Sequence, residues 1–527
     1  MKTELSSSGR ILCRLFHAFW FLAFFGLFVC TLSFMKNQWL SLAAAVLAFA
    51  LLLAFVCRFR ERLDSLPART FRWICAAVCL FIAAAMAFTG YRMCTAPFND
   101  AGTVYYSVAE ILRDGHISTE IGRYTSCAWW SGLSNNDYFL AYKNNIFLPA
   151  YLLPYYRVLT FFGLDMYSFS GYYAGVVLDA VHVAGSVFFG ACAAEKAKDK
   201  TAAFLFLFLC AAFVPYYVHA YTGYSDTLSL PYVSLSLLLY FTAVQKRAGG
   251  NSRGAALYFA LTGSALAVGT LLKPNVAILF VAMVICEAVT GPNLRRAAEA
   301  SACIFLALFL LMGVWRACRL ELPWLDADKA QDYALPVLQW VMMASKGDGG
   351  FRRQDFEFVM HTPPDQRGRV VLRELGRRIR SYGSAGNYLN FEVHKVAAVL
   401  ADGKYAQAGH LVNACTSRPT LAKILLPDGE YYGLFYAYVT AFQCFLLLCF
   451  LASAGMCIFG KHLAGLPLLN IFIFGTLLFF SFWEFKSRYL LNATSAFLLC
   501  AALCVSEGAD VWRDSGTARR LAKGRLS

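Results

Sequence analysis

The stretch "NNIFLPAYLLPYYRVLTFFG", residues 144–163, decides how this chain is threaded through a membrane. It is apolar enough to resemble a membrane span, but two prolines interrupt it, and it carries Arg157 and several tyrosines. We therefore predict a helix that lies in the membrane interface and does not cross the bilayer. A crossing here would move every later segment to the opposite side and would place the basic segment "EKAKDK", 195–200, outside.

The composition around this stretch is that of a membrane protein. Of 527 residues, 59% are hydrophobic and 15% are charged, and the mean hydropathy is +0.53. Soluble domains carry about 25% charged residues. The first apolar run is too long for a removable signal peptide, and a second run follows almost at once. We predict an all-α polytopic membrane protein with about 12 transmembrane helices, near residues 15–34, 39–56, 73–90, 172–194, 201–218, 227–244, 256–272, 276–289, 300–316, 432–458, 464–483 and 489–505.

The basic residues predict the orientation of these spans. The net charge is +15, but most Lys and Arg lie in short segments between spans, which is typical of topology-setting charge and not of nucleic-acid binding. With both termini in the cytoplasm, the inside segments hold Arg10, Arg14, Arg58, Arg60, Arg62, Lys196, Lys198, Lys200, Lys246, Arg247, Arg295, Arg296, Lys461 and the basic tail. Two long loops, 92–168 and 318–430, then face outward, and loops of this length usually carry function.

These features divide the chain into four predicted parts. Residues 1–60 form two extra N-terminal transmembrane helices, and residues 61–320 form a core that includes the first loop, 92–168. The second loop covers 318–430, and residues 431–527 hold the last transmembrane helices and a basic cytoplasmic tail. The 18 cysteines mostly lie inside apolar runs without metal-ligand spacing, so we interpret them as core residues. Whether Cys94 and Cys127 form a disulfide stays an open question.

Ionisable residues gather where the predicted spans reach the outer face. They are Asp100, Asp226, Lys273, Glu484, Lys486 and Arg488. Polar residues at membrane depth are candidates for a functional site. Lys and Arg stabilise the charge that develops on a leaving phosphate, and a carboxylate can take a proton from an incoming hydroxyl. The pattern therefore favours transfer of a group from a phosphate-linked lipid.

Several of these residues also have a purely structural interpretation. Asp100, together with Asn99, can cap the amphipathic helix expected over 101–112. Asp226 can cap its own span, and Lys273 can extend from a span to the membrane interface.

The same holds for other polar and aromatic residues. Glu484 and Arg488 are spaced i, i+4 and can form an exposed helical pair. The indoles of residues 129–130 fit an interfacial belt as well as a surface for stacking sugars. Asp179 and His182 lie one turn apart inside a span, where we expect them to satisfy each other.

Five segments in a fixed order carry a resemblance to a known superfamily. They are "FNDAGTVYYSVAEILRDG" (98–115), "NDYFLAYKNNIFLPAYLLPYYRVLTFFGLD" (136–165), "GTLLKPNVAI" (269–278), "LPVLQWVMMASKGDGGFRRQDFEFV" (335–359) and "FWEFKSRYLLNATSAFLL" (482–499). They resemble the acidic loop, the interfacial segment, the Lys-Pro turn, the Trp-x-Met-Met segment and the Glu-x-x-x-Arg-Tyr motif of the C-type glycosyltransferase superfamily (GT-C). The likeness is to bacterial relatives of the family 39 protein mannosyltransferases, and it leaves the first two spans as an addition.

This resemblance implies a GT-C-like bundle and a glycosyltransferase in a bacterial cell membrane, with its active site facing outward. The donor would be a monosaccharide on a polyprenyl phosphate, and the acceptor a hydroxyl of a cell-surface polymer, glycan, lipid or protein. It implies that Asp100 is the catalytic base and that Lys273 and Arg488 bind the donor phosphate. The supporting residues are Asp226 for sugar or acceptor, Glu484 to orient Arg488, and Asn99, Asn144 and Asn145. We expect no dedicated metal and assign no other cofactor.

One departure from the family pattern narrows these expectations. Many protein mannosyltransferases have Asp-Glu in the first loop, whereas Ala101 follows Asp100 in this chain. We therefore expect a single carboxylate as base, and the departure weakens the case for a protein acceptor. The basic segment "RGRVVLRELGRRIRSYG", 367–383, fits a guide for an anionic acceptor and equally a solvated or lipid-facing amphipathic helix.

Two other functional classes compete with the glycosyltransferase. About 12 spans would also suit a transporter or a lipid-linked sugar flippase, but such proteins tend to show internal repeats and broken helices near the bilayer midplane. The two halves of this chain do not match, and its polar groups collect at one face. A different membrane transferase, for acyl or phosphoethanolamine groups, would need a His-Asp or metal cluster that the outer loops do not display.

Overall fold

The computed structural model describes residues 7–93, 96–121, 133–219, 223–291, 293–406, 420–459 and 465–514, and helices joined by turns and loops make up these ranges. No strand occurs in those ranges, so the prediction of an all-α fold is confirmed. Cys94, Cys127, the indoles of residues 129–130 and the basic tail lie outside the described residues.

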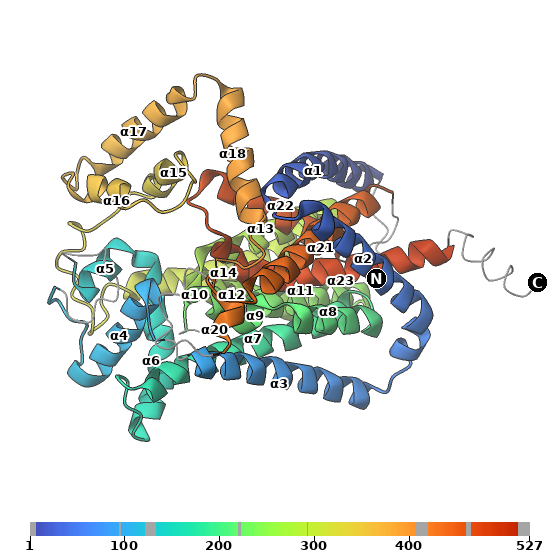
Figure 1. The fold of residues 1–527 in the computed structure, drawn as a ribbon, viewed down its shortest axis with the longest axis horizontal. Coiled ribbons are helices and arrows are strands. Elements are labelled where there is room, and N and C mark those ends of the chain that lie inside the picture. The colour runs from blue at the N-terminus through green and yellow to red at the C-terminus, as the bar shows by residue number, and fades with distance from the viewer. Residues whose placement is uncertain are drawn as a thin grey trace, which may run out of the picture.

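Long apolar helices form the body of the molecule (Figure 1). Within the described ranges, nine helical segments are long and apolar enough to cross a membrane. They are α1 (Ser7–Phe34), α2 (Gln38–Asp64), α3 (Ala68–Met93), α7 (Phe169–Ala197), α10 and α11 together (Ser225–Leu228 and Leu230–Ala248), α12 (Ser252–Leu272), α14 (Leu294–Cys318), α21 (Tyr432–Phe459) and, after the 3-10 helix η3 (Ser487–Ala493), α23 (Thr494–Asp514). The protein is therefore a multi-pass membrane protein.

The other three predicted spans fall on shorter apolar helices, so the count of 12 is not confirmed. They are α8 (Lys200–Ala212), α13 (Ala277–Thr290) and α22 (Leu466–Phe482). The span expected over 201–218 ends early because Pro215, which lacks a backbone N–H, starts a separate turn, α9 (Pro215–Val218). Pro274 similarly starts the 3-10 helix η2 (Pro274–Val276) ahead of α13.

The stretch that decides the threading forms a short helix outside this set. It is α6 (Phe147–Phe161), 15 residues long with Pro154 in its interior, and it is absent from the helices whose length and hydropathy suit a span. Together with α4 (Asn99–Asp114) and α5 (Asn135–Ala141), it lies beyond the ends of the long helices (Figure 1). Since α3 enters the first loop and α14 enters the second, we call this side of the bundle the loop end.

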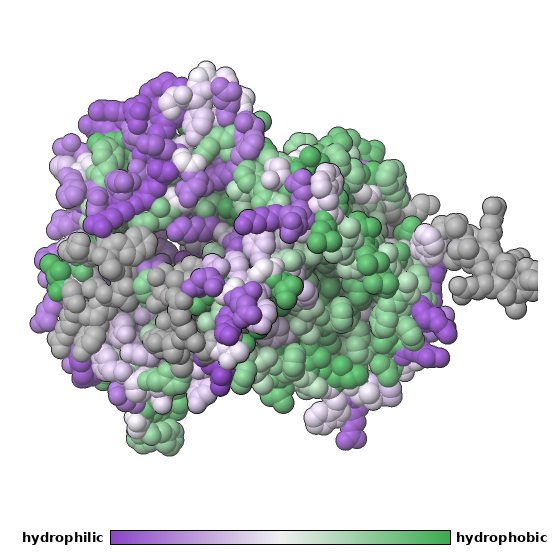
Figure 2. Space-filling model, in the orientation of Figure 1, coloured by the Kyte–Doolittle hydropathy of each residue, from purple (hydrophilic) through white to green (hydrophobic). Residues whose placement is uncertain are grey.

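The second loop adds four helices and a short turn at the loop end. They are α15 (Leu338–Ala344), α16 (Arg353–Met360), α17 (Arg367–Ser381), α18 (Ala385–Leu400) and α20 (Ala422–Leu425). The helix expected in the basic segment 367–383 is confirmed as α17. Figure 2 shows hydrophilic residues over α15–α18 and hydrophobic residues over the bundle.

The opposite end of the bundle is held by ion pairs among basic and acidic side chains. Arg60 of α2 pairs with Asp199, which precedes α8, and with Asp510 of α23. Lys198 pairs with Glu507, 3.0 Å away, also on α23. The N-terminal helices pack against the rest of the bundle, since α1 and α2 both contact α21 and a few buried side chains such as Phe24 and Val56 belong to the main hydrophobic cluster.

Candidate functional site

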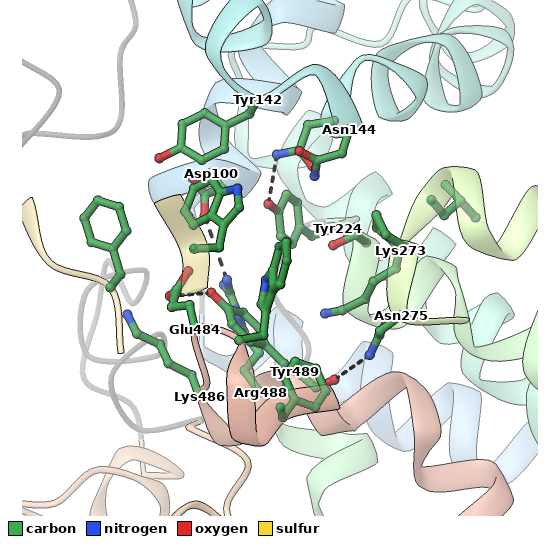
Figure 3. A pocket seen from close by; sticks show the side chains of 18 of the residues that line it. Asp100, Tyr142, Asn144, Tyr224, Lys273, Asn275, Glu484, Lys486, Arg488 and Tyr489 are labelled. Carbon is green, nitrogen blue, oxygen red and sulfur yellow. Dashed lines mark hydrogen bonds and ion pairs between the residues drawn. The ribbon is translucent and has the colours of Figure 1, made fainter. Parts of the chain in front are cut away.

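A cavity of about 600 Å³ opens at the loop end, where α12, α22 and η3 meet α4, α15 and the 3-10 helix η1 (Lys143–Asn145). Seven of the eight predicted site residues line it, namely Asn99, Asp100, Asn144, Asn145, Lys273, Glu484 and Arg488. The eighth, Asp226, contacts two of them. The structure therefore brings together residues from five separate segments of the chain (Figure 3), while their roles stay predictions.

Asp226 sits between the two predicted phosphate-binding cations. Its Oδ1 forms an ion pair with the ammonium of Lys273, and its Oδ2 lies 3.3 Å from Nε of Arg488. The side chains of Asp226, Arg488 and Lys273 are 3%, 9% and 11% exposed. Neither capping alone for Asp226 nor extension of Lys273 to the membrane interface describes this arrangement.

The sequence explains why Lys273 turns into the cavity. Pro274 disfavours helical backbone at the preceding residue, so α12 ends and Lys273 is extended, with φ −150°. The next residue, Asn275, donates to the carbonyl of Tyr489 at 3.2 Å and exchanges amide hydrogen bonds with Asn492. These bonds tie the Lys-Pro turn to η3, the segment that carries Arg488.

Asp100 stands in the first turn of α4 with its carboxylate in the cavity. The N-cap position is Phe98, and Asn99 adopts a left-handed conformation with φ +51°, which Asn tolerates better than most residues. Asp100 therefore is not the N-cap. Its Oδ1 accepts from the hydroxyl of Tyr138 at 3.3 Å, and its Oδ2 lies 3.8 Å from Nη2 of Arg488.

The Asn pair reaches Asp100 through Tyr138. Asn144 donates to the side-chain carbonyl of Asn145 at 2.8 Å, and Asn145 donates to the hydroxyl of Tyr138 at 2.6 Å. Asn145 also lies 3.5 Å from the hydroxyl of Tyr224. A chain of three hydrogen bonds thus runs from η1 to the Asp100 carboxylate.

The segment with Glu484 and Arg488 differs from the expected exposed helical pair. Residues 483–486 are not helical, and Glu484 and Arg488 are only 4% and 8% exposed. Glu484 accepts from the hydroxyl of Tyr489 at 2.9 Å, and the Arg488 guanidinium lies 5.6 Å from the centre of the same ring. Arg488 also forms the ion pairs with Asp226 and Asp100, and its orientation by Glu484 stays a prediction.

Burial also shifts the ionisation of two groups at this cavity. It raises the pKa of the Glu484 carboxyl, because the charged form loses its hydration. It lowers the pKa of the Lys273 ammonium, and the positive charge of Arg488 acts in the same direction. The paired carboxylate of Asp226 therefore matters for keeping Lys273 charged.

A family comparison covers most of this site. Residues 129–509 match a family described as conserved hypothetical integral membrane protein. The chain belongs to this family. No curated protein matches the chain. The matched region includes Asp226, Lys273 and Arg488, whereas Asp100 precedes it. Membership supports an integral membrane protein, and any inference about chemistry rests on the geometry of the site.

Sequence reasoning missed the aromatic side of the cavity. Tyr142, Trp340, Phe351 and Trp483 line it together with Tyr489. Tyr142 stacks on Tyr138 with ring centres 5.0 Å apart, and Trp340 lies 5.4 Å from Tyr142. Tyr489 and Trp340 carried a signal, as parts of the Glu-x-x-x-Arg-Tyr motif and of the Trp-x-Met-Met segment. Tyr142 and Trp340 come together through the approach of the two loops.

Asp179 and His182 do not satisfy each other, contrary to our expectation. Asp179 accepts from the hydroxyl of Thr227, and His182 pairs with the hydroxyl of Tyr151 on α6 at 2.7 Å. Asp179 thereby holds the turn that carries Asp226. Within the described residues, no three His, Cys, Asp or Glu side chains form a metal-ligand group, and the expectation of a metal-free site stays a prediction.

Proposed function

We propose that this protein is a glycosyltransferase that moves a monosaccharide from a polyprenyl phosphate to a hydroxyl acceptor on the outer face of the cell membrane. The observation that carries the proposal is that one cavity at the loop end is lined by the carboxylate of Asp100 and by the cations Lys273 and Arg488, with Asp100 3.8 Å from Arg488. A base and a phosphate-binding pair at the ends of membrane helices are the groups that this transfer needs.

Each residue then has a defined part in the reaction. The acceptor oxygen bonds to the anomeric carbon, and the bond from that carbon to the phosphate oxygen breaks. The phosphate leaves with the electron pair, and its growing charge is stabilised by Lys273 and Arg488. The proton of the acceptor hydroxyl passes to Asp100. Asp226 takes no part in bond changes and keeps the two cations in place.

The walls of the cavity fit a lipid-linked sugar. Apolar surface lies beside the cations on Phe479 and Phe480 of α22 and on Trp483, which follows this helix. A polyprenyl tail can leave the site along this surface towards the bilayer. Trp340 and Tyr142 offer ring faces on the opposite, loop side, where a sugar ring can pack.

The position of the cavity favours a transferase over a transporter. Transporter sites lie near the bilayer midplane between repeats. This cavity is lined by residues at the ends of α12 and α22 and by residues of both loops. The exposed arginines of α17 fit an anionic cell-surface polymer as acceptor; they are Arg369, Arg373, Arg377 and Arg380.

The proposal is tested with purified full-length protein, labelled polyprenyl-phosphate sugar and a membrane acceptor. Asp100→Asn is expected to lower transfer about 10²- to 10⁴-fold, the range for loss of a general base. Asp114→Asn is the matched control, because Asp114 lies at the other end of α4 and pairs with Arg113. Lys273→Ala and Arg488→Ala should weaken donor use. Transfer at the wild-type rate by folded Asp100→Asn would refute the base, and unchanged donor affinity in both cation variants would remove them from the phosphate site.

A further inference from the structure

Lys273 and Arg488, the two predicted phosphate-binding cations, are already paired with carboxylates of the protein. Asp226 contacts Lys273 through Oδ1 and Arg488 through Oδ2, and Asp100 lies 3.8 Å from Arg488. An anionic ligand that binds these cations must therefore compete with one of the two carboxylates. The geometry indicates which carboxylate gives way.

Asp226 and Asp100 are held to different degrees. Asp226 is 3% exposed, contacts both cations and lies outside the lining of the cavity. Asp100 lines the cavity, its side chain is 29% exposed, and its 3.8 Å separation from Arg488 is longer than a hydrogen bond. Asp100 is thus the weaker and more accessible partner of Arg488.

We propose that a phosphate ester entering the cavity replaces Asp100 on Arg488, while Asp226 keeps its contacts with both cations. Arg presents a fork of donors that matches phosphate oxygens, so the exchange trades one long contact for shorter charge-assisted hydrogen bonds. The inference rests on the proposed function, and it adds a regulation of the same site. Asp100 is occupied by Arg488 until the donor arrives and is released as a base only when the donor is bound.

Tyr138 keeps the released carboxylate in position. It donates to Oδ1 of Asp100, the oxygen that does not face Arg488, and it is itself fixed by Asn145. Loss of the Arg488 contact therefore frees Oδ2 while Oδ1 stays anchored. This arrangement predicts ordered binding, in which the donor precedes the acceptor.

The test measures binding of a polyprenyl monophosphate to the full chain in lipid nanodiscs. Arms with the phosphate-free polyprenol and with inorganic phosphate separate the contributions of the tail and of the free anion. Asp100→Asn removes the internal competitor, so its affinity should rise about three- to tenfold, the range that a partly exposed ion pair supports. Asp100→Glu keeps the charge and reaches further, so its affinity should equal or fall below that of the wild type. Asp114→Asn should match the wild type.

Opposite effects of the two variants at position 100 cannot both arise from misfolding. Unchanged or weaker binding by Asp100→Asn, or no binding of the phosphate by the wild-type protein, would overturn the inference. A transfer assay on the same variants separates the inference from the proposed function. Tighter binding with wild-type transfer would refute Asp100 as the base and support the exchange. Lost transfer with unchanged binding would refute the exchange and support Asp100 as the base.

Discussion

Asp226 and Lys273 lie 47 residues apart in the chain and form one ion pair at the ends of two antiparallel membrane helices. Arg488 shares the same carboxylate. Removal of one partner of a buried pair leaves an uncompensated charge, which destabilises by about 3–5 kcal/mol. The stability of the loop end therefore depends on Asp226 more than on either cation.

We predict that Asp226→Asn lowers the free energy of unfolding by about 3–5 kcal/mol, while Lys273→Met has a smaller effect because Asp226 keeps Arg488. The double variant should regain part of the loss. Thermal unfolding in detergent measures these differences. Arg295→Ala is the control, since the pair of Arg295 with Glu299 is 89% and 59% exposed and should change stability by less than about 1 kcal/mol. Equal losses from Asp226→Asn and Arg295→Ala would contradict the central place of Asp226.

The sequence was sufficient to identify the charged residues of the site. Asp100, Lys273 and Arg488 could be found because charges at the ends of apolar runs are rare and the threading places those ends on one side. The short helix α6 could be separated from the spans because of its prolines and Arg157. The first inference uses the charge pattern along the whole chain, whereas the second starts from local composition.

The rest of the site depends on contacts that no local pattern records. Residues 483–486 are extended because the N–H of Phe485 donates to the carbonyl of Gly349 at 3.0 Å, in the second loop. The interpretation of Glu484 and Arg488 as an exposed helical pair, which rested on their i, i+4 spacing, is therefore wrong. Trp340 of the second loop meets Tyr142 at the cavity only after the two loops pack together. Tyr138 reaches Asp100 across 38 residues of the first loop, so neither contact could be predicted from neighbouring residues in sequence.

Tyr138→Phe tests the hydrogen bond that orients the candidate base. The variant keeps the ring stacked on Tyr142 and removes only the hydroxyl that donates to Asp100. We expect turnover to fall about tenfold, the effect of one hydrogen bond worth about 1.4 kcal/mol, with no large loss of donor affinity. In an Asp100→Asn background the same change should have little further effect, because groups that act as a unit are not additive. A full additional tenfold loss there would place Tyr138 in a separate role.

Arg378 is expected to hold the second loop together. Its guanidinium donates to both oxygens of Asp355 on α16, at 2.8 and 2.6 Å, and to the carbonyl of Met342 on α15. Because Arg378 and Asp355 are 7% and 10% exposed, Arg378→Ala should destabilise the loop by about 3–5 kcal/mol. Limited proteolysis should then cut near α16 and α17 at lower protease concentrations than in the wild type.

Arg377→Ala is the matched control for that experiment. Arg377 is the neighbouring residue on α17, it is 63% exposed, and it pairs with Glu374. Exposed pairs contribute little to stability, so this variant should be cleaved as the wild type is. If the second loop of Arg378→Ala resisted the protease as well as that of the wild type, the buried pair with Asp355 would be dispensable.

His219 should make the stability of the loop end depend on pH. The side chain is 1% exposed, and burial, with a contribution from the positive charge of Arg488, lowers the pKa of His219 to about 4. An unfolded His titrates near about 6.5, so between these values the unfolded chain binds more protons than the folded protein. The stability from this group is complete above about pH 7 and falls by up to about 3 kcal/mol as the pH drops towards 4.

His219→Gln should remove this loss, so the melting temperatures of variant and wild type should diverge across that window, with the variant less sensitive to acid. Carboxylates that titrate in the same range affect both proteins and cancel in the difference. His361→Gln, at an exposed site in the second loop, should follow the wild type, and an equal acid slope in His219→Gln would show that His219 is not the group that carries the dependence.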